Sequence, residues 1–305
     1  MLEDIQQITI VGTGLLGASV GLGLRAGGFA GQVVGVGRSP TTVERAVAAG
    51  AIDRGVQDLA EAVGTPGPTL VVVAVPVGGF AEIFRDLAPH QRRGMYVTDV
   101  GSTKLSVAAD AKRYLSQPQF FVPAHPMAGS ERQGPDHAEA DLFRGRPCVL
   151  CPTADTDADA LALVTAFWEG LGATLHTMTA DAHDRQVAAV SHLPHLVAVL
   201  LAHTADDMGP LDLASTGFRD TTRLALSNPP MRRDIIEANR APIAEALDRL
   251  AARLNELRGT IRKAKHTDLL DLLTDAQVIR QAWGDTQAAA SRPLMNDKPE
   301  ESPPR

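Results

Sequence analysis

The feature that most constrains the fold is an alternation, through the first half of the chain, of short apolar runs with longer stretches of helical pattern. The runs are rich in β-branched residues and occupy residues 8–11, 33–36, 70–75 and 96–99. Strands that are apolar at nearly every residue are typical of a parallel sheet covered by helices on both faces. This half is therefore predicted to be a doubly wound α/β domain.

A change of pattern near residue 180 divides the chain. Residues 148–152, 157–170 and 174–178 have the pattern of a last strand, helix and strand, and the β-branched runs then disappear. Apolar residues next recur at spacings of three and four, which predicts helices over residues 185–208 and 242–260. The predicted division is an α/β domain (1–178), an all-helical domain (179–288) and a disordered tail (289–305).

The last predicted helix carries a wide apolar stripe, formed by Ile243, Leu247, Leu250, Leu254 and Leu257. Such a stripe packs either inside its own domain or against a second copy of the chain. A helical domain of about 100 residues has a small core of its own, which favours the second arrangement. We therefore expect a homodimer that forms through these helices.

Composition and charge exclude several classes of partner. Twenty-nine basic and thirty-six acidic side chains give a net charge of -7, so no broad cationic surface is available for nucleic acid. The N-terminus is acidic where a secretion signal is basic, and no apolar run approaches the ~18–20 residues that span a bilayer. A cytoplasmic protein without a membrane partner is expected. Cys148 and Cys151 have no second cysteine pair to complete a zinc site, so we predict no metal and two buried thiols.

A glycine-rich turn follows the first predicted strand and opens the first helix. It consists of Gly12, Thr13, Gly14, Leu15, Leu16 and Gly17. In this context the first glycine permits a tight turn, the second lets the backbone approach a pyrophosphate, and the third lets helix and strand pack closely. The turn predicts a Rossmann-type domain that binds NAD or NADP through these six residues, with Pro76 at the end of the third apolar run also at the coenzyme site.

The end of the second predicted strand bears on the choice of coenzyme. An acidic residue there would accept hydrogen bonds from the ribose hydroxyls of NAD, but the chain has Gly37, Arg38 and Ser39. Without a carboxylate to repel a 2′-phosphate, and with a planar cation and a hydroxyl to hold one, this segment favours NADP. The alternative is that Arg38 is a solvated loop cation.

Two further segments place polar residues just past predicted strands, on the edge where ligands of open α/β sheets gather. Ser102 follows the run at 96–99 and is either a helix N-cap or a hydroxyl that points at substrate. His125 follows a short apolar run at 120–122. A neutral imidazole there can accept a proton from a substrate hydroxyl near pH 7.

The helical half contains two more polar segments. His192 and His195 share one face of a helix that also carries Ser191. A metal would need a further ligand with no obvious source nearby, so a substrate-facing role is favoured over a metal site or a structural role. Arg223 either grips a carboxylate in bidentate fashion or pairs with Asp220.

These motifs resemble those of prephenate dehydrogenases of tyrosine biosynthesis. The glycine turn, DVGSTK at 99–104, AHPMAGSE at 124–131, SHLPH at 191–195 and RDTTR at 219–223 occur in the family's order and at roughly its spacing. The likeness extends from Ile8 to about Trp283. It implies oxidative decarboxylation of prephenate to 4-hydroxyphenylpyruvate by an N-terminal nucleotide domain and a C-terminal helical dimerisation domain.

The resemblance also implies roles for single residues. His125 matches the catalytic histidine, which accepts the proton of the ring hydroxyl as hydride leaves the same carbon, and Ser102 matches the serine that hydrogen-bonds that hydroxyl. The substrate-binding matches are Arg223 for a carboxylate, His195 for substrate contact with His192 and Ser191 close by, and Glu131 at the pocket mouth. Arg232 departs from the family pattern, because some relatives carry tryptophan there.

Three alternatives are left open by the sequence. Prephenate carries a keto acid side chain where arogenate carries an amino acid, and the sequence does not separate a prephenate dehydrogenase from an arogenate or dual-specificity cyclohexadienyl dehydrogenase. A β-hydroxyacid dehydrogenase has a similar domain plan but uses a helical lysine, and residues 184–201 contain none. A coenzyme-sensing binding protein would have no need of a histidine base, a serine and an arginine beyond the nicotinamide.

Overall fold

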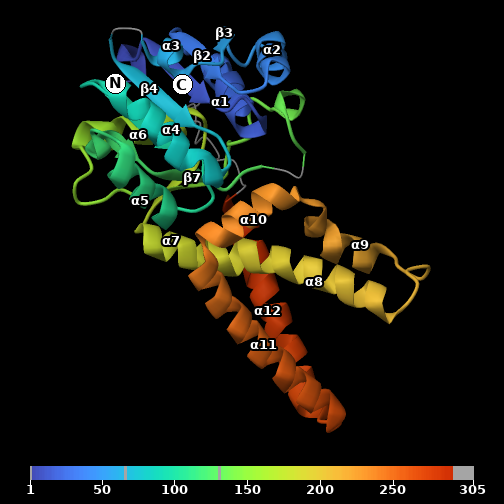
Figure 1. The fold of residues 1–305 in the computed structure, drawn as a ribbon. Coiled ribbons are helices and arrows are strands. Elements are labelled where there is room, and N and C mark those ends of the chain that lie inside the picture. The colour runs from blue at the N-terminus through green and yellow to red at the C-terminus, as the bar shows by residue number, and fades with distance from the viewer. Residues whose placement is uncertain (1, 65–66, 130–131, 291–305) are drawn as a thin grey trace, which may run out of the picture. The chain divides into compact units, whose positions relative to one another are not determined.

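The computed structural model describes residues 2–64, 67–129 and 132–290 (Figure 1). The chain divides into two compact units, Met1–Asp248 and Arg249–Arg305. The division falls inside a long helix, α11 (Arg240–Arg262). The first unit contains the α/β half and all the helices that precede α11, and each unit is described by itself below.

A six-stranded, all-parallel sheet forms the centre of the first unit. Its strand order is β3-β2-β1-β4-β5-β6, and the order of the chain reverses between β1 and β4. The strands are β1 (Gln7–Val11), β2 (Gln32–Val36), β3 (Arg54–Val56), β4 (Thr69–Val73), β5 (Met95–Asp99) and β6 (Phe121–Val122). This order is that of dinucleotide-binding folds, in which ligands bind at the carboxyl ends of the strands where the order reverses. The predicted Rossmann-type doubly wound domain is confirmed.

Helices cover both faces of this sheet. They are α1 (Leu15–Ala26), α2 (Pro40–Ala48), α3 (Leu59–Val63), α4 (Phe80–Leu87), α5 (Leu105–Tyr114) and α6 (Ala158–Gly170). Successive side chains of a strand point to opposite faces. Leu70 and Val72 therefore pack in one core cluster with Trp168 of α6, while Val71 and Val73 pack in a second cluster with Phe84 of α4. Two buried layers explain why the strands are apolar at nearly every residue.

The last strand–helix–strand unit belongs to a separate small sheet. Its strands are β7 (Ala124–Pro126), β8 (Pro147–Leu150) and β9 (Thr174–Thr177), in the order β7-β8-β9. The pair β8 and β9 is parallel and joined through α6, as predicted, but β7 runs antiparallel to β8. Cys148 and Cys151 are buried free thiols here, as predicted, and burial raises the pKa of Cys151 to about 12.

The rest of the first unit is helical. It contains α7 (Ala180–Val187), a π-helical turn η6 (Ala188–His192), α8 (Leu193–Met208), α9 (Thr216–Thr222), the 3-10 turn η7 (Arg223–Leu226), α10 (Pro229–Ala238) and the start of α11. The first three form one long helix in Figure 1. A π turn often marks a functional site, because it inserts one extra residue and re-aims side chains. Here it carries Ser191 and His192.

The long helix corrects one expectation. Ala180–Met208 is, by length and composition, apolar enough to cross a membrane, whereas the sequence was expected to contain no such segment. Helices in the cores of soluble proteins pass the same test. This helix buries four polar side chains: His183, Asp184, His192 and His195. The first three form hydrogen bonds to other elements or to each other. These hydrogen bonds fix the three buried polar side chains of the helix inside the first unit, while only 28% of its most apolar stretch is buried.

The second unit consists, among described residues, of the end of α11 and of α12 (His266–Ala290). Leu250, Leu254 and Leu257 of the predicted stripe line a groove together with Leu272 of α12. Large apolar side chains are exposed on both helices, including Leu254, Ile279 and Trp283. The predicted tail lies outside the described residues from 291 onward, and the boundary at residue 178 stays a prediction.

Candidate active site

The turn between β1 and α1 has the shape that closely approaching phosphates require. Gly12 has a φ of +102°, and a Cβ there would lie 2.4 Å from the carbonyl oxygen of Ala74. A Cβ on Gly17 would lie 2.0 Å from the oxygen of Gly12, so both positions require glycine. At Gly14, by contrast, no atom of the described residues, its own chain neighbours aside, lies within 4 Å of where a Cβ would stand. The space in front of the helix start is therefore open to a ligand.

Backbone donors line this open space. Gly14 is the N-cap of α1 and has no side chain to satisfy the first amides of the helix. Thr13 is buried, and its hydroxyl has no hydrogen-bond partner among residues 2–64, 67–129 and 132–290. Leu15 and Leu16 are half-buried, and Pro76 is exposed at the carboxyl end of β4. These residues fit the pyrophosphate of NAD or NADP, which the unsatisfied amides and the helix dipole would hold.

The end of β2 explains why no acidic residue stands there. A Cβ on Gly37 would lie 2.7 Å from Cγ2 of Val43, so the side chain of Val43 would have to shift to admit a carboxylate residue there. Ser39 is the N-cap of α2, and its hydroxyl accepts a hydrogen bond from the amide of Thr42 at 3.3 Å. Arg38 is exposed. The cation is thus available to a phosphate, while the serine hydroxyl already has a structural partner.

A buried ion pair clamps the strand that carries His125. Lys104 and Asp99 are fully buried and paired with each other. The ammonium also donates to the carbonyl oxygen of Ala124 at 2.6 Å, and the carboxylate accepts from the amide of Ala124 at 2.9 Å. Burial raises the pKa of Asp99, and Lys104 opposes that rise. Because both backbone groups of the residue before His125 are held, the DVGSTK segment fixes the position of the histidine.

The helix that follows this segment is capped from far along the chain. The N-cap position of α5 is Lys104 and not Ser102, so the predicted N-cap role of Ser102 is wrong. The carboxylate of Asp184, in α7, accepts hydrogen bonds from the amides of Lys104 at 2.7 Å and Leu105 at 2.9 Å. It thereby satisfies two of the first amides of α5, as a local capping side chain would do. Ser102 is half-buried in the turn, where its hydroxyl is not needed as a cap.

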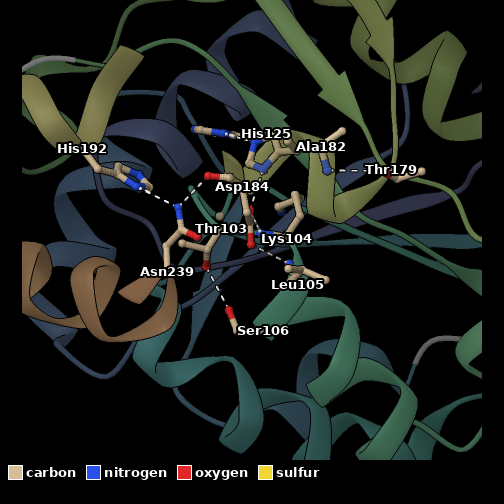
Figure 2. Close-up of polar contacts among 12 residues, drawn as sticks. Thr103, Lys104, Leu105, Ser106, His125, Thr179, Ala182, Asp184, His192 and Asn239 are labelled. Carbon is tan, nitrogen blue, oxygen red and sulfur yellow. Dashed lines mark hydrogen bonds and ion pairs between the residues drawn. The ribbon is translucent and has the colours of Figure 1, made fainter. Parts of the chain in front are cut away.

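Asp184 also begins a series of hydrogen bonds that ends at His125 (Figure 2). A carboxylate only accepts hydrogen bonds, so Nδ1 of His183 donates to Asp184 at 2.7 Å. When Nδ1 is the only protonated nitrogen of His183, its Nε2 accepts from Nδ1 of His125 at 2.8 Å. His125, which donates from Nδ1, keeps a lone pair on Nε2. The series therefore selects the tautomer of His125 that can accept a proton.

The surroundings of His125 keep it neutral. Its side chain is only 8% exposed, and burial holds its pKa well below 6.5. His183, Lys104 and His192 lower that pKa further. A neutral imidazole near pH 7 is the state that a general base requires.

A second fixed imidazole stands beside the first. Asn239 donates from Nδ2 to the carbonyl oxygen of Asp184 at 2.8 Å and approaches Nδ1 of His192 at 3.0 Å (Figure 2). Because that amide nitrogen is a donor, Nδ1 of His192 accepts and its proton lies on Nε2. Burial lowers the pKa of His192 to about 4, with Asp184 opposing and Arg232 adding to the shift. His192 is thus a neutral donor, in contrast to the neutral acceptor His125.

Three further predicted residues lie in the helical part of the first unit, on η6, α8 and η7. His195 is buried, and both burial and Arg232 lower its pKa. Ser191 is half-buried in the π turn, and Arg223 is exposed at the start of η7, which packs on α8. Asp220, considered above as a partner of Arg223, pairs with Arg219 at 3.0 Å. Glu131 lies outside the described residues.

Sequence reasoning missed three residues of this constellation: His183, Asp184 and Asn239. All three are buried, and each makes a hydrogen bond that sets the position or tautomer of a predicted histidine. One signal for the first two was present. His183 and Asp184 are adjacent and lie near the start of a helix whose other buried position is apolar. Buried polar side chains of this kind need buried partners. Asn239 sits between two helices and carries no such signal.

Comparison with known proteins gives matches along most of the chain. A family model described as "Prephenate dehydrogenase, nucleotide-binding domain" matches residues 20–177, and one described as "Prephenate dehydrogenase, dimerization domain" matches residues 179–275. A cyclohexadienyl dehydrogenase of Zymomonas mobilis is 33% identical over 91% of this chain and 96% of its own length. A prephenate dehydrogenase of Bacillus subtilis is 30% identical over 90% of this chain and 75% of its own length.

Solved structures agree with these matches. The prephenate dehydrogenase of Aquifex aeolicus in complex with hydroxyphenyl propionate and NAD+ superposes with a TM-score of 0.87, at 32% identity, over 91% of this chain and 98% of that one. An arogenate dehydrogenase of Synechocystis has a TM-score of 0.76, also at 32% identity, over 91% of this chain and 99% of that one.

Proposed function

The chain belongs to the prephenate dehydrogenase family, and from this premise we propose that it catalyses the NAD(P)-dependent oxidative decarboxylation of prephenate to 4-hydroxyphenylpyruvate. The observation that carries the proposal is the hydrogen-bonded series from Asp184 through His183 to His125. It leaves a neutral, buried imidazole with a lone pair on Nε2, in the unit whose glycine turn fits a dinucleotide. A sensor that only binds coenzyme has no need of such a group.

His125 acts on the ring hydroxyl of the substrate. Its Nε2 accepts the hydroxyl proton as hydride leaves the same carbon, and a bound NAD(P)+ supplies the hydride acceptor. When the bond from the opposite ring carbon to its carboxylate breaks, CO2 departs and the ring becomes aromatic. The electron pair reaches the oxygen, to which His125 returns the proton. The proton that His125 accepts from the hydroxyl thus goes back to the same oxygen, and the base does not need to exchange protons with solvent.

The other predicted residues hold the substrate in this geometry. Ser102, which follows β5 and is not used as a helix cap, hydrogen-bonds the ring hydroxyl. His192 donates from Nε2, and Ser191 and His195 stand beside it on the same long helix. Arg223 and Glu131 are assigned by the family motif, the first to a substrate carboxylate and the second to the pocket mouth. Placing these groups together supplies most of what a downhill decarboxylation requires.

The coenzyme is NAD or NADP, and we propose that NADP is preferred. Gly37 leaves no carboxylate at the end of β2, and the exposed guanidinium of Arg38 is available to a 2′-phosphate. Replacing Arg38 by glutamine should lower the NADP:NAD ratio of kcat/KM by about tenfold, which is the worth of one charge-assisted contact. An unchanged ratio would make Arg38 a solvated cation.

We further propose that residues 1–178 form the dinucleotide-binding domain, that residues 179–288 form the helical substrate and dimerisation domain, and that the protein is a cytoplasmic homodimer. Support for the dimer comes from the large apolar side chains exposed on α11 and α12, since such surfaces in water usually contact a partner. The match of residues 179–275 to a dimerisation-domain model agrees with this. Sedimentation of the purified chain tests it.

A single assay tests the reaction, the substrate and the coenzyme. Absorbance of the reduced nicotinamide is followed with prephenate or arogenate against NAD or NADP. We expect turnover with prephenate. Turnover with arogenate alone, or with both substrates, would establish the arogenate or cyclohexadienyl dehydrogenase activity named for the Synechocystis and Zymomonas relatives. Stoichiometric coenzyme binding without turnover of either compound would identify a sensor.

A further inference from the structure

Arg232, in α10, has no acidic partner among the residues that the structure describes. Its side chain is half-buried, its Nε is fully buried, and that atom has no hydrogen-bond partner among residues 2–64, 67–129 and 132–290. The one hydrogen bond the guanidinium makes there is a long one, 3.4 Å from a terminal nitrogen to the hydroxyl of Ser227. Burial lowers its pKa. A partly desolvated guanidinium with unused donors is costly, so it is retained where it binds an anion.

Arg232 stands in a group of nitrogen donors. It lies close enough to His192 and His195 to lower the pKa of each. Nε2 of His195 is buried and has no hydrogen-bond partner in the described part of the chain. Nδ1 of His192 is occupied by Asn239, so its Nε2–H is available for another acceptor. One permanent positive charge and two neutral imidazoles with unused nitrogens make a site for a carboxylate.

The helix that carries Arg232 lies next to His192, because Asn239, the C-cap of α10, approaches Nδ1 of that histidine at 3.0 Å. Arg232 lowers the pKa of His192, and His192 lowers the pKa of His125. Helix α10 packs on the turn η2 (Val77–Gly79) that follows β4, with a carboxylate oxygen of Asp234 only 2.8 Å from where a Cβ on Gly78 would stand. Helix α10 therefore borders the site at two places, the turn η2 and, through its C-cap Asn239, His192.

We propose that Arg232, together with His195, binds the carboxylate at the end of the substrate's side chain and makes the site prefer the keto acid prephenate to the amino acid arogenate. This rests on the proposed function. Prephenate carries its ring hydroxyl and its side chain on opposite ring carbons, which matches a base at one end and a guanidinium at the other. Arogenate bears an ammonium on the carbon next to that carboxylate, and the ammonium meets the positive charge of Arg232. Tryptophan, which some relatives carry at this position, has no charge and makes no such distinction.

The test compares Arg232→Gln and Arg232→Lys with a matched control, Arg233→Gln. Arg233 is the next residue of the same helix, but it is exposed and paired with Asp234 at 2.8 Å. For Arg232→Gln we expect KM for prephenate to rise at least about tenfold with kcat within about threefold, because the lost contact is made equally in the ground and transition states. The prephenate:arogenate ratio of kcat/KM should fall at least about tenfold. Arg232→Lys should recover part of both, and the control should change neither.

Inhibitor binding provides a readout that does not depend on turnover. Inhibition constants are measured for 4-hydroxyphenylpropionate, which has the carboxylate alone, and for tyrosine, which adds the ammonium. In Arg232→Gln the constant for the propionate should rise and that for tyrosine should rise less or fall. Unchanged KM values, substrate ratios and inhibition constants in Arg232→Gln, or changes of equal size in Arg233→Gln, would overturn the assignment. Wild-type protein that turns over neither substrate would instead contradict the proposed function.

Discussion

Two substitutions of His183 separate its two hydrogen bonds. The amide of an asparagine ends where Nδ1 of the imidazole stands, so His183→Asn can still donate to Asp184 but no longer reaches His125. The amide of a glutamine extends to the position of Nε2, so His183→Gln can accept from Nδ1 of His125 and gives up the bond to Asp184. Both native bonds are short, 2.7 and 2.8 Å, and both lie in a buried environment. The pair of variants therefore asks whether His183 acts by selecting the tautomer of His125.

The expected loss can be worked out from these contacts. In His183→Asn the buried Nδ1–H of His125 has no acceptor, which costs about 1–3 kcal/mol. The imidazole relieves this cost by changing tautomer or turning, and either change removes the lone pair from the substrate. At ~1.4 kcal/mol per tenfold, kcat should fall roughly 5- to 150-fold, while KM for prephenate changes little. In His183→Gln the tautomer is retained, and kcat should stay within about threefold of wild type.

The measurement is steady-state turnover of prephenate, followed by the absorbance of the reduced coenzyme. Circular dichroism and coenzyme affinity establish that both variants are folded. Equal losses of kcat in the two variants would refute the reasoning, because His183 would then serve only to fill space. A loss confined to KM would also refute it, since the tautomer of a base affects the chemical step.

The same geometry makes three more predictions. His125→Asn should lower kcat by about 10²–10⁴ with little change in KM, and turnover within about tenfold of wild type would remove His125 as the base. Arg223→Gln should raise KM for prephenate with kcat nearly unchanged, because the arginine binds a carboxylate equally in the ground state and the transition state. A fall in kcat alone would contradict this role. The pKa of His192 is about 4 when folded and 6.5 when unfolded, so the unfolded chain binds more protons between these values and stability is lost as pH falls through that window. The difference corresponds to about 3 kcal/mol in the free energy of unfolding, measured by urea at pH 7 and pH 4, and His192→Gln should show a smaller loss.

The main sheet was predictable because its strands are buried on both faces. Every side chain of β1 and β4 is buried, and only Gln7, Thr9 and Thr69 among them are polar, so both runs stay rich in the β-branched and apolar residues that identify a strand. The small second sheet was not predictable in the same way. Its strand β7 has three residues, one of which is His125 and another a proline, and it is held by β8 and the Asp99–Lys104 clamp and not by its own propensity.

The candidate site likewise has residues that a local pattern predicts and residues that it does not. Local patterns located the glycine turn, His125 and His192, because each follows from a short motif in a recognisable setting. The groups that orient these residues come from distant segments. The cap of α5 is supplied by Asp184, 80 residues beyond Lys104, and the partner of His192 is Asn239, 47 residues further on. No short pattern around Ser102 reveals that Asp184 of α7 caps helix α5 in its place.

The charges of the described residues explain why the site can offer opposite chemistry at its two ends. Each buried carboxylate is already satisfied: Asp99 by Lys104 and two backbone amides, and Asp184 by two backbone amides and His183. The charge of Asp99 is paired with that of Lys104, and the carboxylate of Asp184 is held by the amides at the start of α5 and by His183. The imidazoles are neutral, and their tautomers are set by fixed partners, so one presents a lone pair and another a proton. Prephenate is a dianion with a hydroxyl at one end. Its hydroxyl proton meets an acceptor there, and its charge meets hydrogen-bond donors at the other end. Protonation of His125 would remove the acceptor. Activity should therefore be lost at acid pH before the coenzyme turn is affected, because the turn binds through backbone amides that do not titrate.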